Sequence, residues 1–193
     1  MNAPAPAPGR ARQLANFAVF QGAWFAAIVG AAHGAPAWGS AAVLAAIGWH
    51  LAVSARPLEE AKLVALACVL GFAIETASVQ VGAIAYPSGQ PDPHLPPYWL
   101  VALWGLLAIA LNVTLRWLKR KPLLAAALGA VLGPLSFVSG VRLGGARFVD
   151  LVPALVLLCA SWAVAMPVLM ALSCRFDGVA VARRKDPEEK PDA

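Results

Sequence analysis

The chain has 193 residues, of which 60% are hydrophobic and only 13% charged, and its mean hydropathy is +0.70. One soluble core does not need this much apolar surface, and the apolar residues stand in long blocks, so the composition excludes an ordinary soluble domain. The formal net charge of +5 does not indicate a nucleic-acid partner, because the positive charges lie in the tails and in short segments between the blocks.

Six apolar blocks follow one another between two polar tails. Blocks of about 18–22 residues match a hydrocarbon core of about 30 Å, and in lipid a helix satisfies its own backbone groups. The sequence therefore predicts an all-α fold, a polytopic membrane bundle of about six transmembrane helices that forms one domain over residues 14–172. The expected helices are 14–32, 37–54, 62–84, 97–118, 122–141 and 150–172. Residues 1–13 are expected to form a disordered N-terminal tail, and residues 173–193 a basic, charged cytoplasmic tail.

The first block has a second interpretation. It follows Arg10 and Arg12 and ends in the small residues "GAAHGA", as a cleaved secretory signal would. The block is longer than a usual signal core and contains Asn16 and Gln21, which favours a retained helix.

The Lys and Arg residues predict the orientation of the bundle. Thirteen of the 15 lie in the tails and in the second and fourth loops, on one side of the membrane, and two lie after the fifth helix. By the positive-inside rule both termini are cytoplasmic. The heavy use of Ala, Gly and Pro is typical of a bacterium with a GC-rich genome, which predicts a multi-pass protein of a bacterial inner membrane.

The third block, 62–84, contains a carboxylate at membrane depth. Gly71, Glu75, Ser78 and Gly82 are spaced 4, 3 and 4 apart and therefore share one helix face, on which small residues flank the acid. A charge at the bilayer centre costs about 2.5–3.5 kcal/mol on insertion scales, so such a group faces a cavity, a partner or the bundle interior. Glu75 is accordingly either a functional acid or a hydrogen-bonded clamp between helices.

The fourth and fifth blocks contain further polar and small residues. Asn112 is expected to bind Asn16 and Gln21 of the first helix as an interhelical clamp, and a substrate- or lipid-facing role is the alternative. The fifth helix has a stripe of small residues for close helix packing, with a proline that should kink it. The packing residues are Gly129, Gly133, Pro134 and Gly140.

The predicted outer side contains the remaining candidates. Arg142 and Arg147 depart from the positive-inside pattern, so we expect them to pair with acids or to hold lipid phosphate, for which a guanidinium is well shaped. A pair between Glu75 and Arg142 requires the fifth helix to end or kink near Gly140. Together with Asn112, the expected substrate- or lipid-facing residues are Ser78, Gln80, His94 and Arg147, and Glu75 and Arg142 are the candidate catalytic residues.

Three segments carry a family resemblance. The stretches 16–32, 95–118 and 127–145 together resemble DUF2878, a family of small bacterial inner-membrane proteins of unknown function. The resemblance covers about residues 14–172 and implies a multi-helix membrane protein, without an activity. It lies in Pro96, Pro97, Trp99, Trp104, Asn112, Gly133, Pro134, Gly140, Arg142, Leu143 and Gly144.

Motifs of soluble cofactor chemistry are missing from the sequence. It contains no Walker A loop, GxGxxG, HExxH, GxSxG or histidine-rich box, and its three histidines are scattered, so we expect neither a metal nor another cofactor. The spacing of Glu75, Ser78, Gly82 and Tyr86 is faintly similar to a membrane helix of carotenoid hydratases and lycopene cyclases, which implies a carboxylic acid that protonates an isoprenoid double bond.

The sequence leaves three hypotheses open for function. The first is a protein of envelope lipid or isoprenoid metabolism, with Glu75 as an intramembrane acid and membrane lipid as its partner. The second is a non-catalytic partner that assembles with another membrane protein through the small-residue stripe. The third is a small carrier with a polar path through the bundle, although the two halves show no clear repeat.

Overall fold

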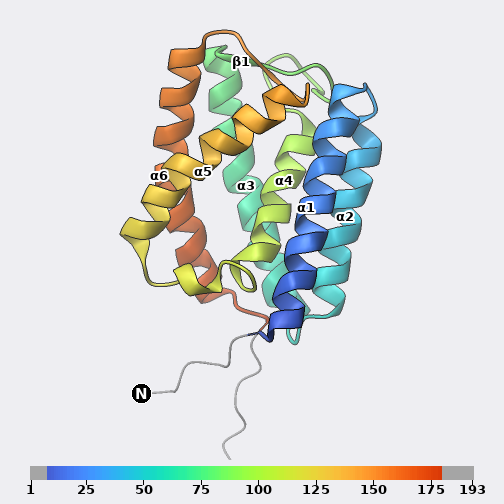
Figure 1. Cartoon of the computed structure of the whole chain (residues 1–193), viewed down its shortest axis with the longest axis vertical. Coiled ribbons are helices and arrows are strands. Elements are labelled where there is room, and N and C mark those ends of the chain that lie inside the picture. Colours follow the sequence, from blue (N-terminus) through green and yellow to red (C-terminus); the bar gives the residue numbers. More distant parts are fainter. Residues whose placement is uncertain (1–7, 180–193) are drawn as a thin grey trace, which may run out of the picture.

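The computed structural model describes residues 8–179, and within them the chain forms six α-helices (Figure 1). Five of the six helices match the predicted blocks to within a few residues at each end, which confirms an all-α bundle. The helices are α1 (Arg10–Ala32), α2 (Pro36–Ala52), α3 (Pro57–Val81), α4 (Tyr98–Leu111), α5 (Pro122–Arg142) and α6 (Leu151–Arg175).

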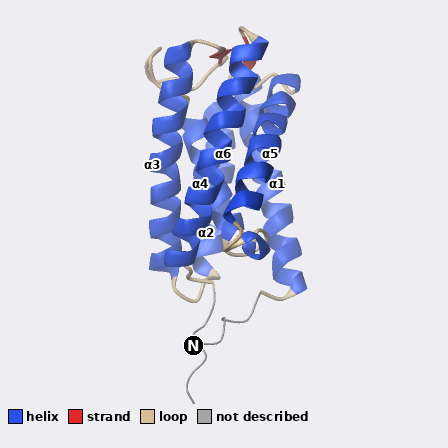
Figure 2. Cartoon of the chain, turned by 90° about the vertical axis from the view of Figure 1, so that its left-hand side faces the viewer, coloured by secondary structure: helices blue, strands red, loops and turns tan. Residues whose placement is uncertain are grey.

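The helices are arranged as two hairpins around a central pair. α1 packs on α2 at one side of the bundle, α5 packs on α6 at the other, and α3 packs on α4 between them (Figures 1 and 2). α4 also contacts α1 and α2, whereas α5 packs mainly on α6. α1 and α5 do not form a close helix pair, because α1 packs on α2 and α4 while α5 packs on α6.

The loops at the end of the bundle far from the termini contact each other. The strand β1 (Ile84–Ala85), after α3, pairs with the antiparallel strand β2 (Arg147–Phe148), after α5. This two-stranded sheet lies opposite the end at which α1 begins and α6 ends (Figure 1). It joins the ends of two helices that are far apart in sequence.

Local sequence signals determine where several helices begin and end. Pro36, Pro57 and Pro122 occupy first-turn positions, where a missing N–H costs no helical hydrogen bond. α3 ends at Gly82, which has φ of 72° and so adopts the left-handed conformation that glycine favours. Asp150 caps α6 by accepting a hydrogen bond from the Val152 N–H.

The fourth helix is shorter than the predicted block 97–118. α4 ends at Leu111, and the chain then turns before the short 3₁₀ helix η1 (Arg116–Leu118). Asn112 is the C-cap of α4, and its side chain turns into the bundle to bind a buried carboxylate. The helix thus ends where polar residues, Asn112, Thr114 and Arg116, interrupt the apolar block.

The edges of the domain also differ from the expected tails. Residues 10–13 belong to α1, and residues 173–175 belong to α6. Beyond α6, Asp177 and Gly178 contact the helical bundle through hydrogen bonds. The rest of the two predicted tails, residues 1–7 and 180–193, lies outside the described residues.

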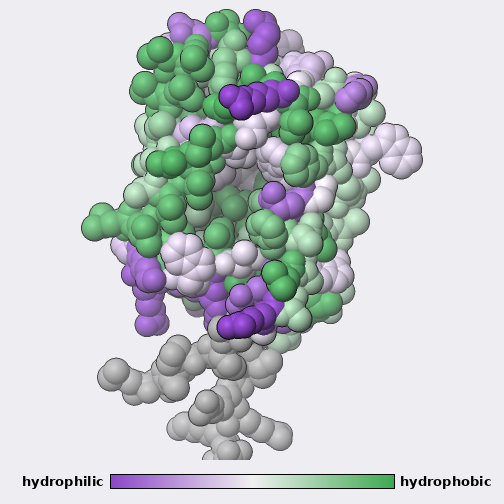
Figure 3. Space-filling view, viewed as in Figure 1, coloured by the Kyte–Doolittle hydropathy of each residue, from purple (hydrophilic) through white to green (hydrophobic). Residues whose placement is uncertain are grey.

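The surface of the bundle is suited to lipid. Four helices, α1, α3, α5 and α6, are long and apolar enough to cross a membrane, and α4 is a shorter apolar helix. Large hydrophobic side chains are exposed, including Leu44, Val69, Leu132 and Val164, and hydrophobic residues dominate the flank in Figure 3. The structure therefore supports a membrane-embedded protein, while six spans with both termini inside remain a prediction.

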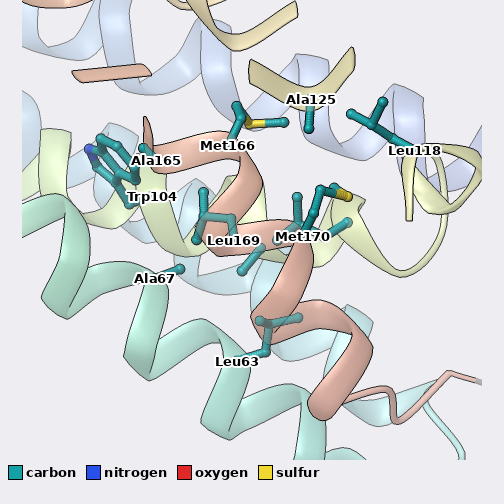
Figure 4. Packing of buried hydrophobic residues seen from close by; sticks show 11 residues of the cluster. Leu63, Ala67, Trp104, Leu118, Ala125, Ala165, Met166, Leu169 and Met170 are labelled. Carbon is teal, nitrogen blue, oxygen red and sulfur yellow. The ribbon is translucent and has the colours of Figure 1, made fainter. Parts of the chain in front are cut away.

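The largest hydrophobic cluster lies where α3, α4, α5 and α6 meet. Figure 4 shows Leu63 and Ala67 of α3 facing Leu169 and Met170 of α6, with Trp104 of α4 at the far end of the cluster. Side chains of this cluster are almost completely buried. The cluster fixes α3 relative to α4 and α6, and thereby the position of Glu75.

Candidate functional site

Glu75 lies on the buried face of α3, in the half of the helix far from the termini. Gly71, Glu75 and Ser78 are all buried, so they share one inward face as their spacing indicates, whereas Gly82 is the cap that ends the helix. The Trp104 Nε1–H donates a hydrogen bond of 3.2 Å to Glu75 Oε1. A Cβ at Gly71 would overlap the Trp104 ring, so this glycine admits the indole that binds the acid.

Two tryptophans form a stacked pair next to the acid. The rings of Trp104 and Trp162 are 4.9 Å apart between centroids and 19° from parallel. Side chains at Gly129 or Gly133 of α5 would overlap atoms of α6, including Trp162. The glycines of α5 thus bring this helix close to α6, and small residues on two helices make room for the aromatic pair.

Three polar atoms near this pair are buried without a well-formed hydrogen bond among residues 8–179. They are Glu75 Oε2, Tyr86 Oη and Trp162 Nε1. The Tyr86 hydroxyl lies close enough to Glu75 to interact with its carboxyl group. Burial, together with that nearby carboxyl, raises the pKa of Tyr86 well above its ordinary value, so the phenol stays protonated. Buried polar atoms usually have hydrogen-bond partners, so a cluster of three such atoms without a well-formed bond is unusual.

These atoms belong to residues that line one large cavity. The cavity has a volume of about 860 Å³, within the range of roughly 300–1,000 Å³ for small-molecule sites. Its walls come from α1 and α5, and its inner surface from α4 and α6. Aromatic and aliphatic side chains dominate, among them Phe20, Trp24, Leu103, Phe137 and Trp162.

The cavity lies between α1 and α5, which do not pack closely together. Figure 3 shows the face between these helices hollowed, with hydrophobic residues around the hollow. Glu75 is only 1% exposed and so lies at the buried end. The opening therefore faces the side of the bundle, where lipid chains would lie if the helices span a membrane.

Arg142 lies at the edge of this cavity, in the last turn of α5. It lines the cavity and its side chain is exposed. Across residues 8–179 the ion pairs do not include one between Arg142 and Glu75, so the structure does not bring the two candidate catalytic residues into contact. Arg147 lies on β2, exposed and outside the cavity lining.

Several other candidates lie away from the cavity. Ser78 is buried and donates to the Ile74 carbonyl of its own helix, and Gln80 is exposed. His94 is exposed in the loop before α4, where its backbone N–H donates a hydrogen bond to Asp92 Oδ1. These residues do not line the cavity, and their substrate- or lipid-facing role stays a prediction.

The remaining α5 residues have separate surroundings. Pro134 is buried within the helix, next to Gly133. Gly140 lines the cavity, and a Cβ there would only touch the end of Ile28 in ordinary van der Waals contact. Close packing on α6 therefore depends on Gly129 and Gly133, while Gly140 keeps the cavity wide near Arg142.

A second polar cluster lies at the opposite end of α3. Glu60 is completely buried, and its Oε2 lies 2.9 Å from His50 Nε2 of α2. Glu60 Oε1 accepts hydrogen bonds from Asn112 Nδ2 at 2.8 Å and from the Gly178 N–H at 2.6 Å. Asn112 also donates to the Phe176 carbonyl.

In this cluster Asn112 is an interhelical clamp, as the sequence predicts, but its partner differs from the expected ones. The asparagine is fully buried, outside the cavity lining, and binds Glu60 rather than Asn16 or Gln21. Asn16 donates instead to the Ile109 carbonyl and accepts from Thr114. The predicted helix starts at residue 62, whereas α3 starts at Pro57, so depth alone does not identify Glu60 as the partner.

The segment after α6 completes this end of the bundle. Asp177 Oδ2 binds Arg116 at 2.6 Å and Lys119 at 2.8 Å, and the Asp177 carbonyl accepts from Arg56. A side chain at Gly178 would overlap the Arg56 carbonyl, so the chain passes closely over the start of α3. Sequence reasoning missed His50 and Glu60; the signal that could have found Glu60 is Pro57 followed by two acids, a typical helix start.

Metal binding has no obvious place in the described part of the chain, where no three His, Cys, Asp or Glu side chains gather as a ligand set. The candidate site is thus built from a carboxyl group, a phenol, two indoles and apolar walls. Such a set can bind an apolar molecule and exchange hydrogen bonds or a proton with it.

These features define an all-α helical protein of the membrane class with a lateral apolar cavity. More specifically, the chain belongs to the family described as "Protein of unknown function (DUF2878)", whose model matches residues 13–168. Comparison with curated proteins gave no match, and neither did comparison with solved structures.

Proposed function

We propose that this protein binds a long apolar lipid in the cavity between α1 and α5, and that Glu75 is the acid that acts on it. The observation that carries the proposal is the cavity itself, which is large, apolar and open toward the side of the bundle, with a carboxyl group at its buried end. A lipid chain can enter such a site from the membrane without crossing water.

The surroundings of Glu75 suit an acid that donates a proton to an unsaturated chain. One carboxyl oxygen is held by Trp104, which orients the group, and the other has no well-formed hydrogen bond in the described chain. Transfer of the Glu75 proton to one carbon breaks the π bond and leaves a carbocation and a carboxylate, and return of a proton from a neighbouring carbon to Glu75 completes a shift of the double bond. The cation would lie among tryptophan rings, whose faces attract cations. An isoprenoid lipid of the cell envelope is the substrate class that this chemistry favours.

Arg142 is proposed to hold the polar end of the same lipid. It lies at the edge of the cavity, and its guanidinium can form paired hydrogen bonds with a phosphate. We therefore place the headgroup at Arg142 and the chain between α1 and α5. In the proposed bacterial inner membrane, with both termini in the cytoplasm, this headgroup lies at the outer surface.

A cavity-filling variant tests whether lipid binds between α1 and α5. Ser136→Trp places an indole in the cavity from α5, whereas Val131→Trp places the same side chain on an exposed position of the same helix. After purification and washing in detergent, mass spectrometry of lipid extracts should detect a retained lipid with the parent and with Val131→Trp, but little with Ser136→Trp. Equal retention by both variants would show that the cavity is not the site.

A charge-removing variant tests the proposed headgroup contact. Arg142→Gln keeps a hydrogen-bonding side chain and should lower retention of a phosphate-bearing lipid by about tenfold, the effect of losing a charge-assisted hydrogen bond of about 1.5 kcal/mol. Arg147→Gln is the control, because Arg147 is exposed nearby without lining the cavity. The same loss in both variants would mean that Arg142 acts only through surface charge.

A further inference from the structure

The buried end of the cavity has a specific hydrogen-bonding character. Glu75 Oε2, Tyr86 Oη and Trp162 Nε1 are each buried and lack a well-formed hydrogen bond among residues 8–179. All three residues line the same cavity, and Tyr86 interacts with Glu75. Leaving the Trp162 N–H unpaired costs about 1–3 kcal/mol, and Glu75 Oε2 and Tyr86 Oη have only their contact with each other, so a bound molecule that pairs with all three gains affinity.

We propose that this end of the cavity binds the hydroxyl group of a long-chain lipid alcohol. The inference rests on the proposed function, in that the chain of the alcohol occupies the apolar part of the same cavity. The hydroxyl is held inside the bundle, next to the buried Glu75, whereas Arg142 lies exposed at the edge of the cavity.

The inventory of donors and acceptors selects a hydroxyl over other groups. A hydroxyl has one hydrogen to donate and two lone pairs that accept. With Glu75 protonated, as its proposed role as an acid requires, the hydroxyl can accept from the Glu75 Oε2–H and from the indole N–H of Trp162 while it donates to Tyr86 Oη. One group of the ligand thus has a role for each of the three buried atoms.

Other polar groups leave part of this end unpaired. An ammonium group only donates, so it offers nothing to the Trp162 N–H. A carboxylate or phosphate only accepts, and it would bring a negative charge into this buried, apolar end of the cavity, which is unfavourable. A hydrocarbon chain pairs with none of the three atoms.

The test compares three probes on the full-length protein in detergent. The probes are a long-chain isoprenoid alcohol, its methyl ether and its parent hydrocarbon, and binding is followed by the quenching of tryptophan fluorescence. The alcohol should bind at least about fivefold more tightly than the ether, because a net hydrogen bond contributes about that factor to affinity. The hydrocarbon should bind most weakly and still measurably.

Two tyrosine variants test whether the preference for the alcohol depends on Tyr86. Tyr86→Phe should weaken alcohol binding about fivefold and leave hydrocarbon binding unchanged, which also shows that the variant is folded. Tyr98→Phe is the control, because Tyr98 is exposed and outside the cavity lining. Alcohol affinity should be unchanged in that variant.

The possible failures separate the two proposals. If the three probes bind equally, or if Tyr86→Phe leaves alcohol affinity unchanged, the hydroxyl site is wrong while the lipid cavity stands. If none of the probes binds to the parent, the cavity does not hold an apolar chain, and both proposals are overturned.

Discussion

Two glutamates on α3 are buried to the same degree but have very different surroundings. Glu60 and Glu75 are separated by about 22 Å along the helix axis at 1.5 Å per residue. Glu60 is bound by His50, Asn112 and the Gly178 N–H, so both of its oxygens are paired. Glu75 accepts one well-formed hydrogen bond, from Trp104, its second oxygen has only the nearby Tyr86 hydroxyl, and the residue lines a cavity.

The difference separates a structural carboxylate from a candidate functional one. The contacts of Glu60 join α2, α3, the end of α4 and the segment after α6, so they fix the bundle where the chain ends. Glu75 fixes only α3 to α4, and it leaves hydrogen-bonding capacity for another molecule. Burial of an acid alone is therefore weaker evidence of function than burial with an unpaired atom facing a cavity.

The largest expected effect is an all-or-none difference in reporter activity, which shows which of the two glutamates lies in the outer half of the membrane. Fusions of a reporter that is active only outside the cytoplasm should work after Gly34, Gln90 and Gly145. They should fail after Glu60, Lys121 and Ala193, because thirteen of the 15 Lys and Arg residues lie on that side. Activity at the second group would reverse the comparison and place Glu60 at the outer end.

Removal of Glu60 should have the largest effect on stability. Glu60→Leu removes the partner of His50 and of the Gly178 N–H and leaves Asn112 only its bond to the Phe176 carbonyl, so we expect a loss of about 3–5 kcal/mol in the free energy of unfolding. Denaturant unfolding in detergent measures it. Glu59→Leu is the matched control, since Glu59 only forms an exposed pair with Lys62, and its stability should stay near that of the parent. A stable Glu60→Leu protein would contradict the structural role.

A smaller loss is expected where Gly71 admits Trp104. A Cβ at this position would overlap the indole, so Gly71→Ala should cost about 1–3 kcal/mol through overpacking. Gly48→Ala, on α2 with no atom near its Cβ, should instead stabilise by roughly 0.5–1 kcal/mol. Thermal unfolding of both variants checks the difference. If both behave alike, Trp104 is not held tightly against α3 and its bond to Glu75 is incidental.

Hydropathy was sufficient to predict the fold class. Five of the six helices begin and end close to the predicted blocks, because each block is long, apolar and bounded by Pro, Gly or charged residues. α4 is the exception. Polar residues, Asn112, Thr114 and Arg116, follow Leu111 within the predicted block, and the helix ends there. The bond from Asn112 to Glu60 cannot be predicted until the start of α3 is known.

The candidate site could be predicted only in part. The spacing of Gly71, Glu75 and Ser78 correctly indicates a buried face, because helix geometry alone decides it. The cavity could not be predicted, since it depends on α5 packing against α6 and away from α1. Trp104 and Trp162 meet for the same reason, so their pairing depends on tertiary structure rather than on a sequence motif.

The central claim is that Glu75 acts as an acid on a bound lipid, and the most direct test is Glu75→Gln. The amide is nearly isosteric and keeps a hydrogen-bond acceptor for Trp104, but it is not a proton donor. The melting temperature in detergent should stay close to that of the parent. Lipid extracts of cells that produce the parent should contain a lipid changed by the protein, and extracts with Glu75→Gln should lack it. A stable Glu75→Gln protein that still changes the lipid would contradict the claim and leave Glu75 as a clamp between α3 and α4.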